Sequence, residues 1–187
     1  MKNAILGYNS YNGTFVPIRA DSSTDSIQSI DYAHHEVHSG SHFMYSDSVE
    51  LDSAGVQDYL ITTPNTTKWV HVIVHVDGSA ITQFQVYEAT DKSGTTLQTV
   101  YNNNRNSATL PTVTVHKATS GGTTDGVLLS QYKGGSATNQ SKAGTSTGNN
   151  EEMILKQNTK YIIRITSGTN DNLTNLRLEW YEHQNIV

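Results

Sequence analysis

Residues 68–77, KWVHVIVHVD, decide the fold class because their side chains alternate strictly between apolar and mixed positions. An extended chain places successive side chains on opposite faces, so period-two alternation indicates a half-buried strand. One face of this strand carries Val70, Val72, Val74 and Val76, and the other carries Trp69, His71, Ile73 and His75. We predict that the valine face lies in the core.

The same pattern recurs along most of the chain. Further strands are predicted at residues 43–51, 57–62, 81–89, 112–117, 127–132, 151–155, 160–167 and 173–182. Turn residues at 77–79 and at 156–159 predict hairpins that join the strands on either side. No stretch has helical periodicity, so we expect an all-β protein. Regular turns and two long loops, at 91–107 and 133–150, favour a jelly roll or β-sandwich over a simple meander.

Composition is consistent with one β-rich domain that carries an arm. The chain has 187 residues, of which 35% are hydrophobic and 16% charged, and it contains no cysteine. Residues 1–30 hold few and irregularly spaced apolar side chains, with one short strand predicted at 14–19, where Pro17 restricts it to a sheet edge. We therefore divide the chain into an N-terminal arm, residues 1–41, and a jelly-roll domain, residues 42–187. Such an arm becomes ordered by docking onto another surface, and the alternative is a frayed terminus.

Four of the eight histidines lie within residues 31–43, DYAHHEVHSGSHF. If residues 31–38 form a strand, His34, Glu36 and His38 share one face and could bind a transition metal. This spacing lacks the helical His-Glu-x-x-His pattern of zinc proteases. We therefore expect no metal there and histidines that hydrogen-bond to neighbours. The segment at 39–41 predicts a break before His42.

We find no sequence signature of catalysis. There is no Gly-x-Ser-x-Gly elbow, no cysteine nucleophile and no phosphate-binding glycine loop. Glu151, Glu152, Glu179 and Glu182 could in principle form a glycosidase pair, but acidic residues beside strands are usually solvated. We therefore expect no enzyme, catalytic residue or cofactor. A net charge of −5 argues against non-specific nucleic-acid binding, and no apolar run is long enough to span a membrane.

Binding is the better-supported class of function. Several tyrosines fall in loops or on polar faces: Tyr8, Tyr11, Tyr32, Tyr45, Tyr101, Tyr132 and Tyr181. Tyrosines of this kind can stack against sugars or form a protein interface, where tyrosine is enriched. Both uses stay open from the residues alone.

Several long blocks of the sequence resemble a group of virion proteins from tailed bacteriophages. The blocks are YAHHEVHSGSHF (32–43), YLITTPNTTKW (59–69), YNNNRNSAT (101–109), GGTTDGVLLSQYKGGSATNQS (121–141), ILKQNTKYIIRITSGTNDNLTN (154–175) and EWYEH (179–183). The leader NSYNGTFVPIRAD (9–21) is similar to the start of those proteins, although Phe15 stands where tryptophan is common. The resemblance spans about residues 8–183 and brings no catalytic residues.

The resemblance implies a β-rich structural protein of the virion. We expect a capsid decoration, or cement, protein that binds the major capsid protein on the outer surface of the head and associates as a homotrimer. The candidate docking residues are Phe15, Val16, Ile18, Tyr32 and His35. The alternative is a fibre domain or a host-surface module that binds carbohydrate.

Overall fold

The computed structural model describes residues 6–9, 13–17, 31–136, 145–146 and 149–184. Within these residues the chain forms one short helix and many strands. In chain order they are β1 (Leu6–Asn9), β2 (Thr14–Pro17), α1 (Tyr32–Ser39), β3 (His42–Leu51), β4 (Val56–Thr62), β5 (Lys68–Gly78), β6 (Thr82–Glu88), β7 (Ser93–Leu97), β8 (Tyr101–Asn102), β9 (Thr114–Ser120), β10 (Val127–Gly134), β11 (Thr145–Ser146), β12 (Asn149–Leu155), β13 (Lys160–Ser167) and β14 (Asn172–Gln184).

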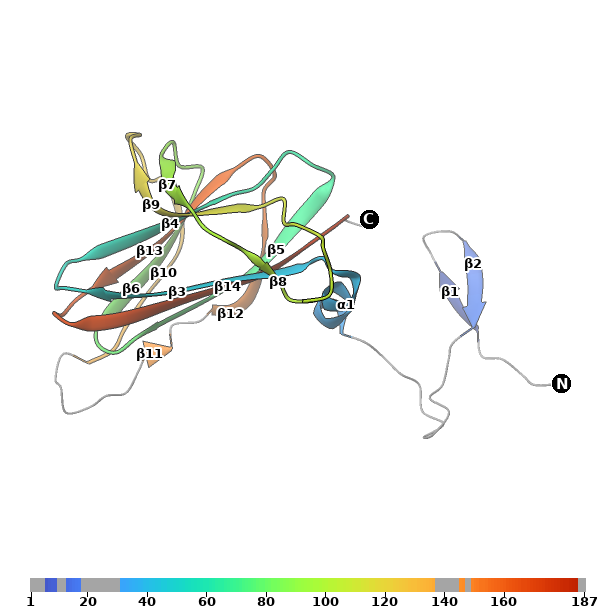
Figure 1. Cartoon of the computed structure of the whole chain (residues 1–187), viewed down its shortest axis with the longest axis horizontal. Helices are drawn as coiled ribbons and strands as arrows, with labels where there is room; N and C mark the ends of the chain where they lie inside the picture. Colours follow the sequence, from blue (N-terminus) through green and yellow to red (C-terminus); the bar gives the residue numbers. More distant parts are fainter. Residues whose placement is uncertain (1–5, 10–12, 18–30, 137–144, 147–148, 185–187) are drawn as a thin grey trace.

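Two antiparallel sheets face each other in a β-sandwich (Figure 1). The first sheet has β14 at its centre, between β3 and β5, and β12 and β11 both pair with the outer side of β5. The second sheet has the order β10-β6-β13-β4-β9-β7. Four antiparallel pairs, β3 with β14, β4 with β13, β5 with β12 and β6 with β10, form a ribbon that is rolled across both sheets. This is the connectivity of a jelly roll, as predicted.

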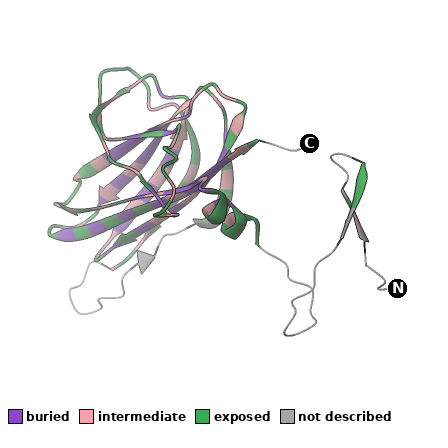
Figure 2. Cartoon of the chain, turned by 45° about the vertical axis from the view of Figure 1, so that its right-hand side comes forward, coloured by how far each residue is buried: buried purple, intermediate pink, exposed green. Residues whose placement is uncertain are grey.

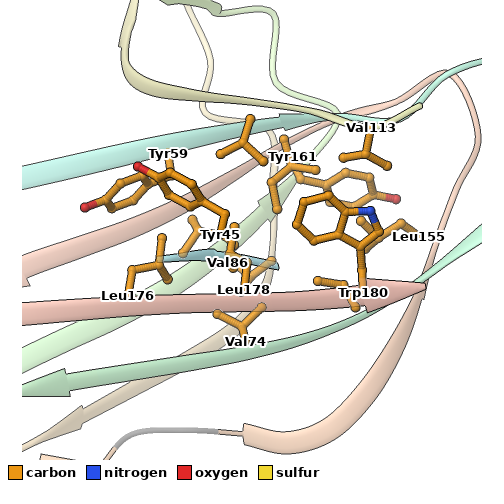
Figure 3. Close-up of a cluster of buried hydrophobic side chains, with 14 of the residues drawn as sticks. Tyr45, Tyr59, Val74, Val86, Val113, Leu155, Tyr161, Leu176, Leu178 and Trp180 are labelled. Atoms are coloured by element: carbon orange, nitrogen blue, oxygen red, sulfur yellow. The ribbon is translucent and has the colours of Figure 1, made fainter. Parts of the chain in front are cut away.

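The core lies between the two sheets (Figures 2 and 3). The valines of β5 are buried as predicted, each with at most 3% of its surface exposed. On the neighbouring strand β14 of the same sheet, Leu176, Leu178 and Trp180 lie beside these valines, and all three are buried. The opposite sheet contributes Tyr161, Ile163 and Ile165 from β13 together with Tyr59 and Ile61 from β4. Alternation along β5 therefore identified its core face correctly.

Both predicted hairpins are wrong. Strands β5 and β6 lie in different sheets, and so do β12 and β13. The turn at Gly78 carries the chain from one sheet to the other. This position requires glycine, because a Cβ at Gly78 would lie 1.8 Å from the Thr82 hydroxyl oxygen. Turn residues indicate that the chain reverses. They do not indicate whether the next strand pairs with the previous one or joins the opposite sheet.

The strand predicted through residues 34–38 is also wrong, because this segment is helix α1. The Asp31 carboxylate accepts a hydrogen bond from the Ala33 amide at 2.9 Å, which caps the first turn. Gly40 adopts a left-handed conformation, with φ of 77°, and its amide bonds to carbonyls of the last turn. The predicted break at residues 39–41 is therefore the end of a helix, and β3 follows at His42.

The expected loop at residues 91–107 contains β7 and β8, and it is ordered by asparagine side chains. The Asn102 amide group donates to the carbonyls of Gly40 and Thr109, at 2.8 and 3.1 Å, while its side-chain oxygen accepts from the Asn104 amide at 2.8 Å. These bonds attach the loop to the end of α1. Most of the second expected loop, residues 133–150, lies outside the described residues.

A second polar anchor lies on the outer face of the other sheet. The Arg164 guanidinium on β13 binds Asp58 of β4 through two hydrogen bonds, at 2.7 and 2.9 Å. It also binds Asp125 through two hydrogen bonds, at 2.7 and 3.0 Å, and Lys92 forms an ion pair with the same carboxylate. Planar two-bond pairing makes these among the stronger polar contacts. They hold the segment before β10 against the sheet.

In the arm, β1 and β2 form a two-stranded hairpin that stands apart from the sandwich in Figure 1. Tyr8 pairs with Phe15 across the strands, with ring centroids 5.3 Å apart, and the two side chains are 62% and 67% exposed. The predicted strand at 14–19 thus corresponds to β2 as far as Pro17, which is its last residue. Residues 18 and 19 lie outside the described residues.

We expect Leu178→Ala to lower the free energy of unfolding by about 2–5 kcal/mol, because it leaves a cavity where a fully buried side chain packed. Leu173→Ala lies on the same strand at a position that is 46% exposed, so it should change stability by only about 0.5 kcal/mol. Urea unfolding followed by tryptophan fluorescence measures both variants. Equal losses for the two would contradict the assignment of faces on β14.

Candidate functional site: a histidine–tyrosine cluster

The first sheet carries a cluster of aromatic and titratable side chains on its outer face, next to α1. We call it the histidine–tyrosine cluster, and its members are Tyr32, His42, His71, Glu152, Tyr181 and His183. Strand alternation on β14 places Trp180 and Glu182 toward the core and Tyr181 and His183 on the outer face. In the strand register Tyr181 lies opposite His42 on β3 and opposite His71 on β5.

The rings of the cluster are stacked across three strands. The His71 ring lies on the Tyr181 ring with centroids 4.6 Å apart and an interplanar angle of 15°. The His42 ring, on the opposite neighbour strand β3, also stacks against the Tyr181 ring, with centroids 6.3 Å apart. Tyr32, from the first turn of α1, meets His183 edge-on at 5.1 Å. The cluster therefore attaches α1 to the end of β14, the central strand of the sheet.

A chain of short polar contacts runs through the same residues. The Tyr32 hydroxyl lies 3.0 Å from Nδ1 of His183, and Nε2 of His183 lies 2.8 Å from Nε2 of His71. On its other side, His71 Nδ1 lies 2.5 Å from the Glu152 carboxylate. That carboxylate also accepts the Tyr181 hydroxyl, at 2.9 Å from both oxygens. Four elements, α1, β5, β12 and β14, thus share one polar network.

Burial shifts the pKa of three members of the cluster. Burial, together with the hydrogen bond to Glu152, raises the pKa of the Tyr181 hydroxyl well above its ordinary value. Partial burial and the nearby Glu36 carboxylate raise the pKa of Tyr32. Burial lowers the pKa of His42, which is only 9% exposed. The Asn103 amide group lies 2.6 Å from His42 Nδ1, where it can donate to the neutral ring.

Helix α1 separates the three residues that a strand would have placed on one face. His34 and His38 are one turn apart on an exposed face, with Nε2 atoms 3.0 Å from each other. Glu36 is 5% exposed, and its carboxylate accepts from the Ser39 hydroxyl at 3.1 Å. The described residues contain no group of three or more His, Cys, Asp or Glu side chains arranged to hold a metal ion. The absence of metal at His34, Glu36 and His38 stays a prediction.

The structure does not bring the five candidate docking residues together. Phe15 is exposed on the hairpin, the Val16 side chain is not described, and Ile18 lies outside the described residues. Tyr32 is 47% exposed and bonded to His183, whereas the His35 side chain is 62% exposed beside Glu36. Phe15 and the two helix candidates therefore belong to separate surfaces.

Three of the four carboxylates considered for hydrolysis have structural partners. Glu182 is 1% exposed and accepts bonds from the amides of Thr112 and Val113 and from the Trp180 indole. Glu179 pairs with Arg177 at 2.5 Å on the outer face of the sheet. Glu152 belongs to the histidine–tyrosine cluster, and the side chain of Glu151 is not described. Glu182 is thus a buried anchor for the loop before β9, contrary to the solvated position expected for it.

Sequence reasoning missed His183 and Glu152 as members of a site. The predicted strand ends at residue 182 and leaves His183 out, although extending its alternation by one residue places His183 beside Tyr181 on the outer face. Glu152 could be found only by knowing that β12 pairs with β5.

The described residues include no helix long and apolar enough to cross a membrane.

A pocket of about 400 Å³ lies at the same end of the first sheet. It is lined by Trp69, Ile154, Leu155, Lys156 and Gln157. Trp69 is 38% exposed and lies opposite His183 in the strand register. The pocket therefore adjoins the histidine–tyrosine cluster.

No family model, curated protein or solved structure matches this chain.

We expect the stability of the protein to fall as pH decreases from 7 to 5, in part because of His42. The folded protein holds the pKa of His42 below its ordinary value, so the unfolded chain takes up a proton first, from about pH 6.5 downward. His42→Asn should therefore give a shallower loss of unfolding free energy over this range. His34→Asn, on the exposed face of α1, is the control. An unchanged slope in His42→Asn, measured by urea unfolding at each pH, would contradict the assignment.

Proposed function

We propose that this chain is a non-enzymatic capsid decoration protein of a tailed bacteriophage, bound to the outer surface of the head. Its partner in this proposal is the major capsid protein, and it acts as a homotrimer without nucleic acid or membrane. The observation that carries the proposal is the exposed aromatic hairpin joined to a jelly roll. The sequence resemblance to phage virion proteins supports the same function.

The hairpin β1–β2 has the properties of a docking element. A two-stranded hairpin alone is marginally stable in water, so it gains stability by packing on another surface. Tyr8 and Phe15 form an exposed pair, and aromatic side chains of this kind often dominate the binding energy of interfaces. Residues 18–30 connect the hairpin to α1 and can span at most about 45 Å when fully extended. This length lets the hairpin reach a surface that the sandwich itself does not touch.

Strand β10 supports self-association. It is an edge strand of the second sheet, and it exposes Val127, Leu128, Leu129 and Tyr132 by 46–63%. Protein surfaces with contiguous apolar side chains on an edge strand commonly contact another chain. Three linked hairpins would bind a shell more tightly than one, because binding of the first raises the effective concentration of the others.

A second function, a carbohydrate-binding module of a fibre or host-surface protein, is favoured by the pocket at Trp69. An exposed indole can stack against a sugar ring, while Lys156 and Gln157 line the same pocket. Copy number separates the two functions. A decoration protein should be present in hundreds of copies on each particle, and a receptor-binding module in at most tens.

We expect Phe15→Ser to weaken binding to undecorated heads by about tenfold or more, since it removes half of the exposed aromatic pair. Deletion of residues 1–30 should abolish binding, while the truncated protein still folds and still forms trimers. Co-sedimentation with heads measures binding, and light scattering after gel filtration measures the oligomer. Leu110→Ser is the matched control, because Leu110 is 80% exposed on the jelly-roll domain.

If the truncated protein decorates heads as well as the full chain, the arm is not the docking element. If Leu110→Ser weakens binding as strongly as Phe15→Ser, the contact lies on the jelly-roll domain instead. Glycan binding that is lost in Trp69→Ala, with no binding to heads, would favour the second function.

A further inference from the structure

We propose that His71 and His183 form a binding site for a divalent transition metal, with Cu²⁺ or Ni²⁺ as the best-fitting ions. The site lies within the histidine–tyrosine cluster and does not depend on the proposed function. Its two protein ligands are the Nε2 atoms of the facing imidazoles, and water completes the coordination.

The first argument is the hydrogen bonding of the two Nδ1 atoms. Nδ1 of His71 faces the Glu152 carboxylate at 2.5 Å, and Nδ1 of His183 faces the Gln184 carbonyl oxygen at 2.8 Å. An ionised carboxylate and a carbonyl can only accept, so each Nδ1 carries the proton. In its neutral form each ring then presents a lone pair at Nε2, and the two Nε2 atoms are 2.8 Å apart. Two lone pairs at this distance repel unless a cation lies between them.

The second argument is that this arrangement is the one found around metal-binding histidines. Such histidines almost always donate their other ring N–H to a carboxylate or a backbone carbonyl, which fixes the tautomer and orients the ring. His71 has the carboxylate and His183 has the carbonyl. The Tyr181 ring, stacked on His71 at 4.6 Å, and the Tyr181 hydroxyl, bonded to Glu152, hold this geometry further.

The third argument is the separation of the two nitrogens. Two ligands each about 2.0 Å from one metal lie about 2.8 Å apart when they subtend 90°, and about 3.3 Å apart in a tetrahedral site. The observed 2.8 Å fits the 90° angle of square-planar or octahedral coordination. Cu²⁺ and Ni²⁺ favour this geometry with imidazole ligands, whereas Zn²⁺ prefers the tetrahedral one. His183 is half-buried, so water can reach the remaining positions.

A shared proton is the competing cation. The Tyr32 hydroxyl lies 3.0 Å from Nδ1 of His183 and could donate to it, which would move the His183 proton to Nε2. In that tautomer the Gln184 carbonyl oxygen would face a lone pair on Nδ1 of His183 at 2.8 Å, with no proton between them. The experiment therefore distinguishes a metal from a proton.

The test uses the full chain purified without an affinity tag. Cu²⁺, Ni²⁺ and Zn²⁺ are each titrated by calorimetry, and Cu²⁺ is followed by electron paramagnetic resonance. We expect one Cu²⁺ or Ni²⁺ per chain at this site, at least tenfold weaker binding in His71→Asn and His183→Asn, and nitrogen splitting from two imidazoles. His75→Asn, on the same face of β5, is the matched control, and a background with His34→Asn and His38→Asn removes the exposed helical pair.

Glu152→Gln provides a second test if the histidine variants unfold. It keeps the shape of the side chain but replaces the carboxylate that orients His71, so metal binding should weaken while circular dichroism stays unchanged. Binding that persists in His71→Asn and His183→Asn would overturn the proposal. The proposal would also be overturned if no metal binds and nuclear magnetic resonance spectra show a proton shared between the two rings. A preference for Zn²⁺ over Cu²⁺ and Ni²⁺ would overturn it as well.

Discussion

The structure depends on the position of β14 between β3 and β5, because this one strand sets both the core and the candidate site. It is paired along ten residues with β3 and along eleven with β5, so its register is fixed from both sides. A one-residue slip would exchange every inward and outward side chain. Trp180 would leave the core, and Tyr181 would leave the histidine–tyrosine cluster. The buried Glu182 adds a further restraint, because the amides of Thr112 and Val113 reach its carboxylate only when it points inward.

The two faces of β14 differ in kind, and this explains why they have different uses. The inner face is apolar and needs only shape and volume to be filled, as Leu176 and Leu178 do. The outer face near α1 concentrates titratable rings, and each ring needs a specific partner. Polar networks of this type are favourable when every member is satisfied and costly when one is not. With the tautomers that we propose, the facing Nε2 atoms of His71 and His183 are the point where protein partners alone leave the network incomplete.

Sequence reasoning was successful where the physical signal is local. The valines of β5 identified a strand and its core face, and the regular spacing of similar strands identified the jelly roll. It failed at residues 32–39, where the alternation of His34, Glu36 and His38 was taken for a strand although Asp31 and Gly40 are good helix caps. It also failed at Gly78, because a turn does not specify the sheet that receives the next strand. The meeting of His71 with His183 could not be predicted, since it depends on the pairing of strands that are more than a hundred residues apart.

The hydrogen bond between Tyr32 and His183 places the start of α1 and the end of β14 at the same end of the sandwich. The turn after β13 lies at the opposite end, where Asn172 bonds to Ala80, Ile81 and Ser167. This polarity matters for the design of fusion proteins. A peptide attached after Gln184 would emerge at the end of the sandwich that carries the start of α1. A peptide inserted near Asp171, clear of the Asn172 bonds, would project from the far end.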